Sequence, residues 1–220
     1  MNPAAELGPS KFAWWQDWRG ECCAIVAGGP SVKAVGVELL RNRIHVIAVK
    51  ESVDLCPWAD VVYGCDGAWW RHRKGMSEFR GLKIAYDPRA CTEFGLQKIH
   101  IENASTDKML FDEPGMIGSG GNSGFQAANL AAQFGATGIL MIGFDMEHTN
   151  GGAHWYGRNN WLNCSNPLES NFKRWRTAFR GSAHQLKTIG IDVVDASPNG
   201  KLDCFRKRSI GDAMNDWGLA

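Results

Sequence analysis

The sequence predicts an α/β protein with a Rossmann-like, mostly parallel sheet and helices on both faces. About six or seven short apolar runs alternate with segments of helical spacing, which is typical of parallel strands joined by crossover helices. Two of these runs, 22–27 and 139–142, lead directly into glycine, as at the turn from a strand to the next helix. The second run is apolar throughout, which indicates a strand covered on both faces.

The composition is that of one globular domain. The chain has 220 residues, of which 44% are hydrophobic, and a formal net charge of +1. Such a balanced charge gives no electrostatic argument for a nucleic-acid or membrane partner, and no apolar run approaches the ~20 residues of a membrane span. The seven cysteines show no repeated C-x-x-C spacing, and the N-terminus lacks the layout of a secretory signal. We therefore expect a cytoplasmic protein.

We expect three parts along the chain. Residues 1–20 form an N-terminal aromatic arm, 21–205 a Rossmann-like nucleotide-binding or transferase domain, and 206–220 a C-terminal tail. The arm contains WWQDW, for which we expect a short helix that packs on the domain. Because its tryptophans recur at near-helical spacing, the arm is also a candidate interface between copies of the chain, as in a homo-oligomer.

The first apolar run leads into a glycine turn, Gly28-Gly29-Pro30-Ser31, and we expect a helix from Val32 to about Arg41. A strand, a glycine turn and a helix N-terminus in this order are typical of a nucleotide-binding corner. The spacing matches neither G-x-G-x-x-G nor the P-loop. A glycine turn is also how any strand-to-helix unit changes direction, so both interpretations stand.

The runs 44–49 and 61–63 predict the next two strands, followed by shorter ones at 82–86 and 98–101. Asp66 follows the run at 61–63 and is a candidate catalytic carboxylate, although Asp66-Gly67 is also a common turn pair. The basic and aromatic stretch 69–74 comes next. It is either a solvated helix face or a wall of a ligand cleft.

The stretch 118–146 predicts a glycine-rich loop, a helix and a buried strand. Ser123 is the expected helix cap, and Gly135 the expected stop. Apolar residues recur at i, i+3, i+4 and i+7 in this helix, namely Ala127, Leu130, Ala131 and Phe134. Backbone N–H groups at such a helix N-terminus suit a phosphate. The candidate nucleotide-binding residues are Gly28, Gly29, Pro30, Ser31, Gly120, Gly121, Asn122 and Ser123; the serines alternatively only cap helices.

Asp145 follows the buried strand 139–142, at the sheet edge where α/β proteins bind ligands, and is a candidate catalytic residue or a hydrogen-bond anchor. About twenty residues without helical or strand period come next, which is typical of a lid or binding loop. His154 in this loop is our candidate general base, because histidine titrates in the required range; the alternative is an exposed bystander. A helix over 168–186 and a strand over 191–195 complete the predicted domain.

Four motifs in this order, AIVAGGPSV, VVYGCDG, the 118–146 stretch with GGAHWYG, and VVDASPNGKLDCF, resemble the MptE-like superfamily, which is similar to 6-hydroxymethylpterin diphosphokinase. They also resemble motility-associated factor glycosyltransferases and, more distantly, family-42 sialyltransferases; small stand-alone members occur in bacteriophages. The resemblance covers about residues 22–205 and implies nucleotide-dependent transfer. Ala27 stands where a first glycine is common, and the helical regions of the flagellin-modifying enzymes are missing, which argues against protein glycosylation.

The resemblance implies a transferase, and we expect a glycosyltransferase that uses a CMP-type sugar donor with His154 as base. Its partners would be a nucleotide or nucleotide-sugar and a small-molecule or glycan acceptor. One alternative is a diphosphokinase acting on a small hydroxymethyl-bearing substrate, with Mg²⁺ bound by Asp66 and Asp145. Another alternative is a nucleotide-binding module without turnover. No histidine and cysteine spacing predicts a zinc site.

Overall fold

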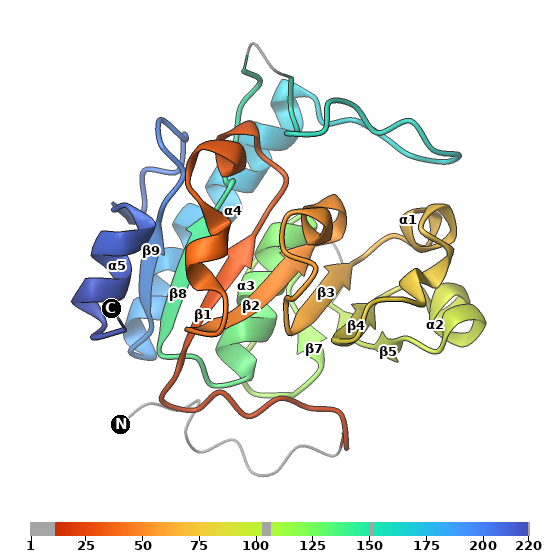
Figure 1. Cartoon of the computed structure of the whole chain (residues 1–220), viewed down its shortest axis with the longest axis horizontal. Coiled ribbons are helices and arrows are strands. Elements are labelled where there is room, and N and C mark those ends of the chain that lie inside the picture. The colour runs from red at the N-terminus through yellow and green to blue at the C-terminus, as the bar shows by residue number, and fades with distance from the viewer. Residues whose placement is uncertain (1–11, 103–106, 150–151, 220) are drawn as a thin grey trace.

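A computed structural model of the chain describes residues 12–102, 107–149 and 152–219 (Figure 1). Its centre is an eight-stranded sheet in which every pair of neighbouring strands is parallel. The strands of this sheet are β1 (Cys22–Val26), β2 (His45–Val49), β3 (Val61–Gly64), β4 (Leu82–Ala85), β5 (Gln97–Lys98), β8 (Gly138–Ile142), β9 (Asp192–Asp195) and β10 (Arg206–Lys207). A small second sheet pairs β6 (His100–Ile101) with β7 (Met116–Ile117). The predicted fold class is confirmed.

The helices connect and cover these strands. The α-helices are α1 (Gly67–His72), α2 (Pro88–Phe94), α3 (Ser123–Gln133), α4 (Glu169–Thr188) and α5 (Ile210–Asp216). Short 3₁₀ helices are η2 (Pro30–Ala34), η3 (Val37–Leu40), η4 (Lys50–Asp54) and η5 (Lys74–Met76). None of the helices in the described parts of the chain is long and apolar enough to cross a membrane.

The order of strands across the sheet is β10-β9-β8-β1-β2-β3-β4-β5. The chain starts near the middle at β1, moves outward through β5, and returns to the other side of β1 with β8. The connections therefore reverse direction between β1 and β8. In open α/β sheets, the crevice at such a reversal, beyond the carboxyl ends of the strands, is where ligands bind.

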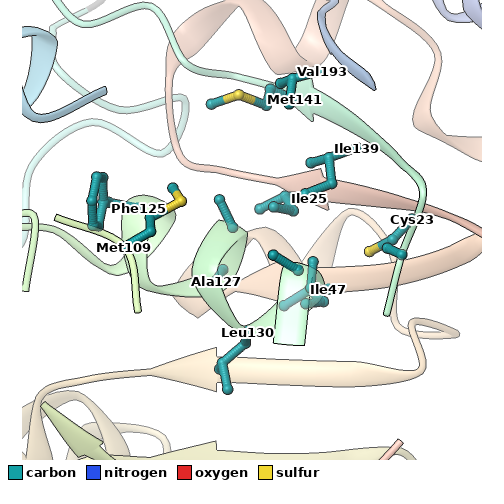
Figure 2. Packing of buried hydrophobic residues seen from close by; sticks show 14 of the residues in the cluster. Cys23, Ile25, Ile47, Met109, Phe125, Ala127, Leu130, Ile139, Met141 and Val193 are labelled. Atoms are coloured by element: carbon teal, nitrogen blue, oxygen red, sulfur yellow. The ribbon is translucent and has the colours of Figure 1, made fainter. Parts of the chain in front are cut away.

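Side chains alternate between the two faces along each strand, as the pleat requires. On one face, residues such as Ile25 and Ile139 pack against α3 and α4, and Figure 2 shows them gathered beside Ala127 and Leu130 of α3. On the other face, alternate residues such as Val26 pack against the 3₁₀ helices, α1, α2 and α5. Helices thus cover both faces, as predicted.

Helix α3 is buried along its whole length, not only on its apolar stripe. Its residues Asn129 and Gln133 are satisfied by the backbone of the neighbouring segment 109–118. Asn129, for example, accepts hydrogen bonds from the N–H groups of Leu110 and Gly118, each at 2.9 Å. Asn122, and not Ser123 as predicted, caps this helix, since its Oδ1 accepts from the Phe125 N–H at 2.8 Å. The helix ends at Phe134, and Gly135 follows at φ +96°, as the glycine stop predicts.

The helix predicted from Val32 to about Arg41 is wrong. Residues 30–40 instead form η2 and η3, which are separated by Gly36 at φ +69°. This left-handed conformation interrupts helical hydrogen bonding, and glycine adopts it without steric cost. The predicted strand at 98–101 is likewise divided between β5 and β6.

The short helix predicted for WWQDW is also absent from the described residues 12–20; residues 1–11 of the arm lie outside the described part of the chain. A helix of five residues is marginal by itself, and the aromatic rings of this segment pack on the domain instead. Trp18 is buried, its N–H donates to the Phe134 carbonyl at 2.8 Å, and its ring lies edge-on to Phe134 and stacks on His45. The described part of the arm thus docks on the end of α3.

The C-terminal segments contribute β10, α5 and α4 to the layers described above. Residues 206–216 add β10 to the sheet and α5 to its second face, where Ile210, Ala213 and Met214 are buried. On the first face, α4 buries Phe172, Phe179 and Leu186, while Trp175 and Ala183 remain partly exposed.

Candidate active site

A cavity of about 450 Å³ lies at the carboxyl ends of β1, β2, β3 and β8, at the point where the connections reverse. The long segment after β8 runs over this edge of the sheet (Figure 1). The predicted site residues that line the cavity are Gly28, Gly29, Asp66, Gly121, Asn122, Ser123, Asp145 and His154. The predicted residues Pro30, Ser31 and Gly120 are not among its lining residues. The two glycine-rich segments, about ninety residues apart in the chain, thus meet at one cavity, as a shared phosphate site would require.

The corner after β1 is held tightly against the end of β8. The Gly29 N–H donates to the Gly143 carbonyl at 2.9 Å, and a Cβ at position 29 would overlap both that carbonyl and the Asp145 carboxylate. Only glycine therefore fits at this close approach. The N–H of Ser31 is engaged as well, since it donates to Asp145 Oδ1 at 3.3 Å. Each of these two N–H groups could bind a phosphate only if it broke its hydrogen bond to the segment that follows β8.

Asp145, which follows β8, is the residue that the corner after β1 contacts through Ser31. It is buried and accepts a hydrogen bond from the Ser31 hydroxyl at 2.8 Å. Burial raises the pKa of this carboxyl above its ordinary value, and the hydrogen bonds from Ser31 partly oppose that rise. The geometry matches the hydrogen-bond anchor that was one of the two interpretations of Asp145.

The N-terminus of α3 forms the opposite side of the cavity through residues 121–124. Its position is fixed from below by Tyr63, whose hydroxyl donates to Gln126 Oε1 at 2.9 Å, while Gln126 Nε2 donates to the Ser119 carbonyl at 2.9 Å. Trp175 of α4 donates to the Gly121 carbonyl at 2.9 Å. The positive end of the α3 dipole is therefore held rigidly at the cavity, where it favours an anion.

His154 lies across the cavity from α3, beside the glycine corner. The N–H of Trp155 donates to the Gly28 carbonyl at 2.8 Å, and the His154 ring stacks on Tyr156 with centroids 5.0 Å apart. Burial, reinforced by the charge of Lys50, lowers the pKa of His154 to about 4, against an opposing backbone hydrogen bond with Gly28. The imidazole is consequently neutral near pH 7 and has a free lone pair for a proton.

Asp66 also lines the cavity, but it is paired. Its carboxylate accepts from the ammonium group of Lys50, the residue that directly follows β2. The sequence analysis missed Lys50. The available signal was a basic residue immediately after a predicted strand, in the position that Asp66 holds after β3. In the described part of the chain, no three His, Cys, Asp or Glu side chains gather in a group that could hold a metal ion.

The segment after β8 contributes a wall of amide side chains that sequence analysis also missed. Asn159 and Asn166 exchange two hydrogen bonds, of 2.8 and 3.0 Å, and the Tyr156 hydroxyl donates to Asn159 Oδ1 at 2.9 Å. All three residues line the cavity. This pairing closes a loop of eight residues and gives the segment a fixed shape without regular secondary structure.

The basic and aromatic cluster at 69–74 does not reach the cavity; none of its members is among the described lining residues. Arg73 pairs with Glu51 and Asp54, Arg71 with Glu93, and His72 stacks on Trp161. Trp69 and Trp70 are fully buried. The cluster therefore holds α1 in place and does not form a wall of the cavity.

No protein-family model matches the chain, and no curated protein matches it. The solved structures with a similar fold include two sialyltransferases. One is the monofunctional α-2,3-sialyltransferase Cst-I from Campylobacter jejuni, which aligns over 86% of this chain and 80% of its own, with 12% identity and a TM-score of 0.52. The other is the C. jejuni sialyltransferase CstII in complex with cytidine-5'-monophosphate, which aligns over 87% of this chain and 86% of its own, with 14% identity and a TM-score of 0.50. At such identity the likeness shows a shared fold.

Proposed function

We propose that this protein is a glycosyltransferase that takes its sugar from a CMP-activated donor. One observation carries the proposal: the α3 N-terminus, the glycine corner after β1 and a neutral histidine meet in a single cavity at the reversal point of a parallel sheet. The N-terminus of α3 is suited to bind a phosphate, and a neutral histidine can take up a proton. The similar fold of a sialyltransferase solved with cytidine-5'-monophosphate supports cytidine as the nucleoside of the donor.

In the proposed reaction, an acceptor hydroxyl attacks the anomeric carbon of the donor sugar. His154 takes the hydroxyl proton on its free ring nitrogen as the new carbon–oxygen bond forms. The bond between the anomeric carbon and the phosphate oxygen breaks, and CMP leaves with the electron pair. The dipole of α3, directed at the cavity, would stabilise the negative charge on the departing phosphate. His154 would be active in its neutral form, which burial favours.

The Mg²⁺-dependent diphosphokinase remains the alternative because Asp66 and Asp145 both line the cavity. To bind a metal, Asp66 would have to release Lys50, and Asp145 would have to release Ser31. These existing bonds make us prefer the sugar transferase. A nucleotide-binding module without turnover would use the same cavity, so turnover has to be measured.

Thermal shift with CMP, UDP, ADP and ATP, each with and without Mg²⁺, tests the nucleotide. A ligand at a hundred times its Kd stabilises the native state by ~2.7 kcal/mol, and we expect that response to CMP without a need for metal. Release of CMP from CMP-sialic acid then tests turnover. His154→Gln should lose turnover and keep the CMP shift, whereas His184→Gln, an exposed residue of α4, should keep both.

Two outcomes would contradict the proposal. A response to ATP that requires Mg²⁺, with none to CMP, would favour the diphosphokinase. Binding of CMP without release of CMP from any activated sugar, in the wild-type protein, would favour the binding module.

A further inference from the structure

Lys50 has an unusual backbone conformation for its residue type. It follows β2 directly and adopts φ +51°, in the left-handed region that non-glycine residues enter at a cost. This conformation turns the chain from β2 into η4 at the rim of the cavity. Backbone strain of this kind persists where the surrounding structure holds the residue in place, and it is frequent at active sites and ligand-binding sites.

Lys50 is also the one lysine or arginine among the described residues that line the cavity, and it is paired there with Asp66. A phosphate entering this cavity needs positive charge. The N–H groups of Gly29 and Ser31 are already paired with the end of β8. The groups that remain for an anion are the α3 N-terminus and the ammonium group of Lys50.

The ion pair of Lys50 with Asp66 is asymmetric in its exposure. The Lys50 side chain is 22% exposed, whereas that of Asp66 is 57% exposed. Asp66 can therefore turn into solvent, where water replaces Lys50 as the partner of its carboxylate. Lys50 would stay in the cavity with its charge available for another anion.

We propose that Lys50 binds the phosphate of the donor nucleotide, and that Asp66 holds the ammonium group in the empty cavity and releases it when the phosphate arrives. This inference rests on the proposed function and adds to it the residue that neutralises the donor. It predicts that Lys50 recognises the phosphate and not the nucleoside.

The experiment compares the affinities of cytidine and CMP for four variants in buffer with EDTA, by calorimetry. Lys50→Asn removes the charge and keeps a residue that tolerates positive φ, so the fold should persist. We expect it to bind CMP about ten- to a hundredfold more weakly, the value of a charge-assisted hydrogen bond, and to bind cytidine as before. Lys50→Arg should retain the preference for CMP. Lys98→Asn, at an exposed position on β5, is the matched control and should change neither affinity.

Asp66→Asn separates this inference from a metal site. It removes the competing carboxylate, so CMP affinity should rise about two- to fivefold, as expected for loss of a weak ion pair. The same titrations are repeated with Mg²⁺ in place of EDTA, and a fall in CMP affinity of Asp66→Asn that appears only with Mg²⁺ would make Asp66 a metal ligand and overturn the inference. Wild-type binding of CMP that Lys50→Asn preserves would overturn the inference alone. No wild-type response to CMP would refute the proposed function, and the inference with it.

Discussion

The hydroxyl of Ser31, on the turn after β1, donates a hydrogen bond of 2.8 Å to the carboxylate of Asp145, 114 residues further along the chain. The two residues stand at the ends of the adjacent strands β1 and β8. Their bond joins the segments that follow β1 and β8, beside the cavity and at the point where the sheet connections reverse. The arrangement of the candidate site depends on this contact, and it leads to the first two predictions.

Gly29→Ala should destabilise the protein by about 1 to 3 kcal/mol, because the new methyl group would overlap the Asp145 carboxylate and the Gly143 carbonyl. Urea unfolding measures the change. Gly181→Ala is the matched control: it lies in the interior of α4 with open space around its Cα, so alanine should stabilise by about 0.5 to 1 kcal/mol. Equal stability of Gly29→Ala and wild type would show that the corner can move away from Asp145 and Gly143 without cost.

Asp145→Asn should change the pH dependence of stability in a defined direction. The folded-state pKa of Asp145 is raised by burial above its ordinary value of 3.8. A raised pKa means that the folded state binds the proton more tightly, so this residue's contribution is full below pH 3.8 and is lost as the pH rises through the folded pKa. The free energy of unfolding of Asp145→Asn relative to wild type should therefore increase with pH across that window. A difference that is flat with pH, or of opposite slope, would contradict the burial of the carboxylate.

His154→Gln should remove a contribution to the free energy of unfolding whose pH dependence is opposite to that of Asp145. The pKa of His154 falls from 6.5 to about 4 in the folded state, so the fold favours the neutral ring. Its contribution is present above pH 6.5 and is lost as the pH falls toward about 4, at most about 2 kcal/mol between pH 6.5 and about pH 5. Chemical denaturation at these two pH values should show that the free energy of unfolding falls less on acidification for His154→Gln than for wild type. Identical losses would place the ring in solvent.

Tyr63→Phe should cost about 1 to 3 kcal/mol, because it leaves the buried Gln126 oxygen without its donor. The same change would loosen the hold of Gln126 on the Ser119 carbonyl and so weaken CMP binding at the α3 N-terminus. Tyr86→Phe, at an exposed position, is the control and should stay within about 0.5 kcal/mol of wild type. Calorimetry with CMP and urea unfolding measure the two effects. A Tyr63→Phe variant with wild-type stability would show that this hydrogen bond contributes nothing net.

Much of the fold follows from the sequence alone, because apolar periodicity reports directly which residues must be buried. The predicted apolar run 139–142 lies within the fully buried β8, and Gly135 follows the end of α3 as expected. Both features are local: burial of a strand on two faces, and a left-handed residue after a helix, each leave a mark within a few positions. The glycine-rich segments at 28–31 and 120–123 were recognised for the same reason.

Local patterns failed where tertiary contacts outweighed them. Trp18 packs on Phe134 instead of extending a helix, and Gly36 divides the segment after β1 into two short turns of 3₁₀ helix. Asn122 caps α3 in place of Ser123, a choice between two adjacent good caps that depends on the path of the preceding glycines. Of these differences, the docking of Trp18 on Phe134 is the one set by a long-range contact.

The sequence by itself determined the layered α/β fold and the segments that border its ligand-binding edge. Only the tertiary structure decided which side chains meet there: Lys50 with Asp66, Ser31 with Asp145, and His154 with Gly28. Those meetings follow from the order of strands in the sheet, with β1 placed between β8 and β2. Strand order is set by the simultaneous packing of both faces, a property of the whole chain that no local pattern records.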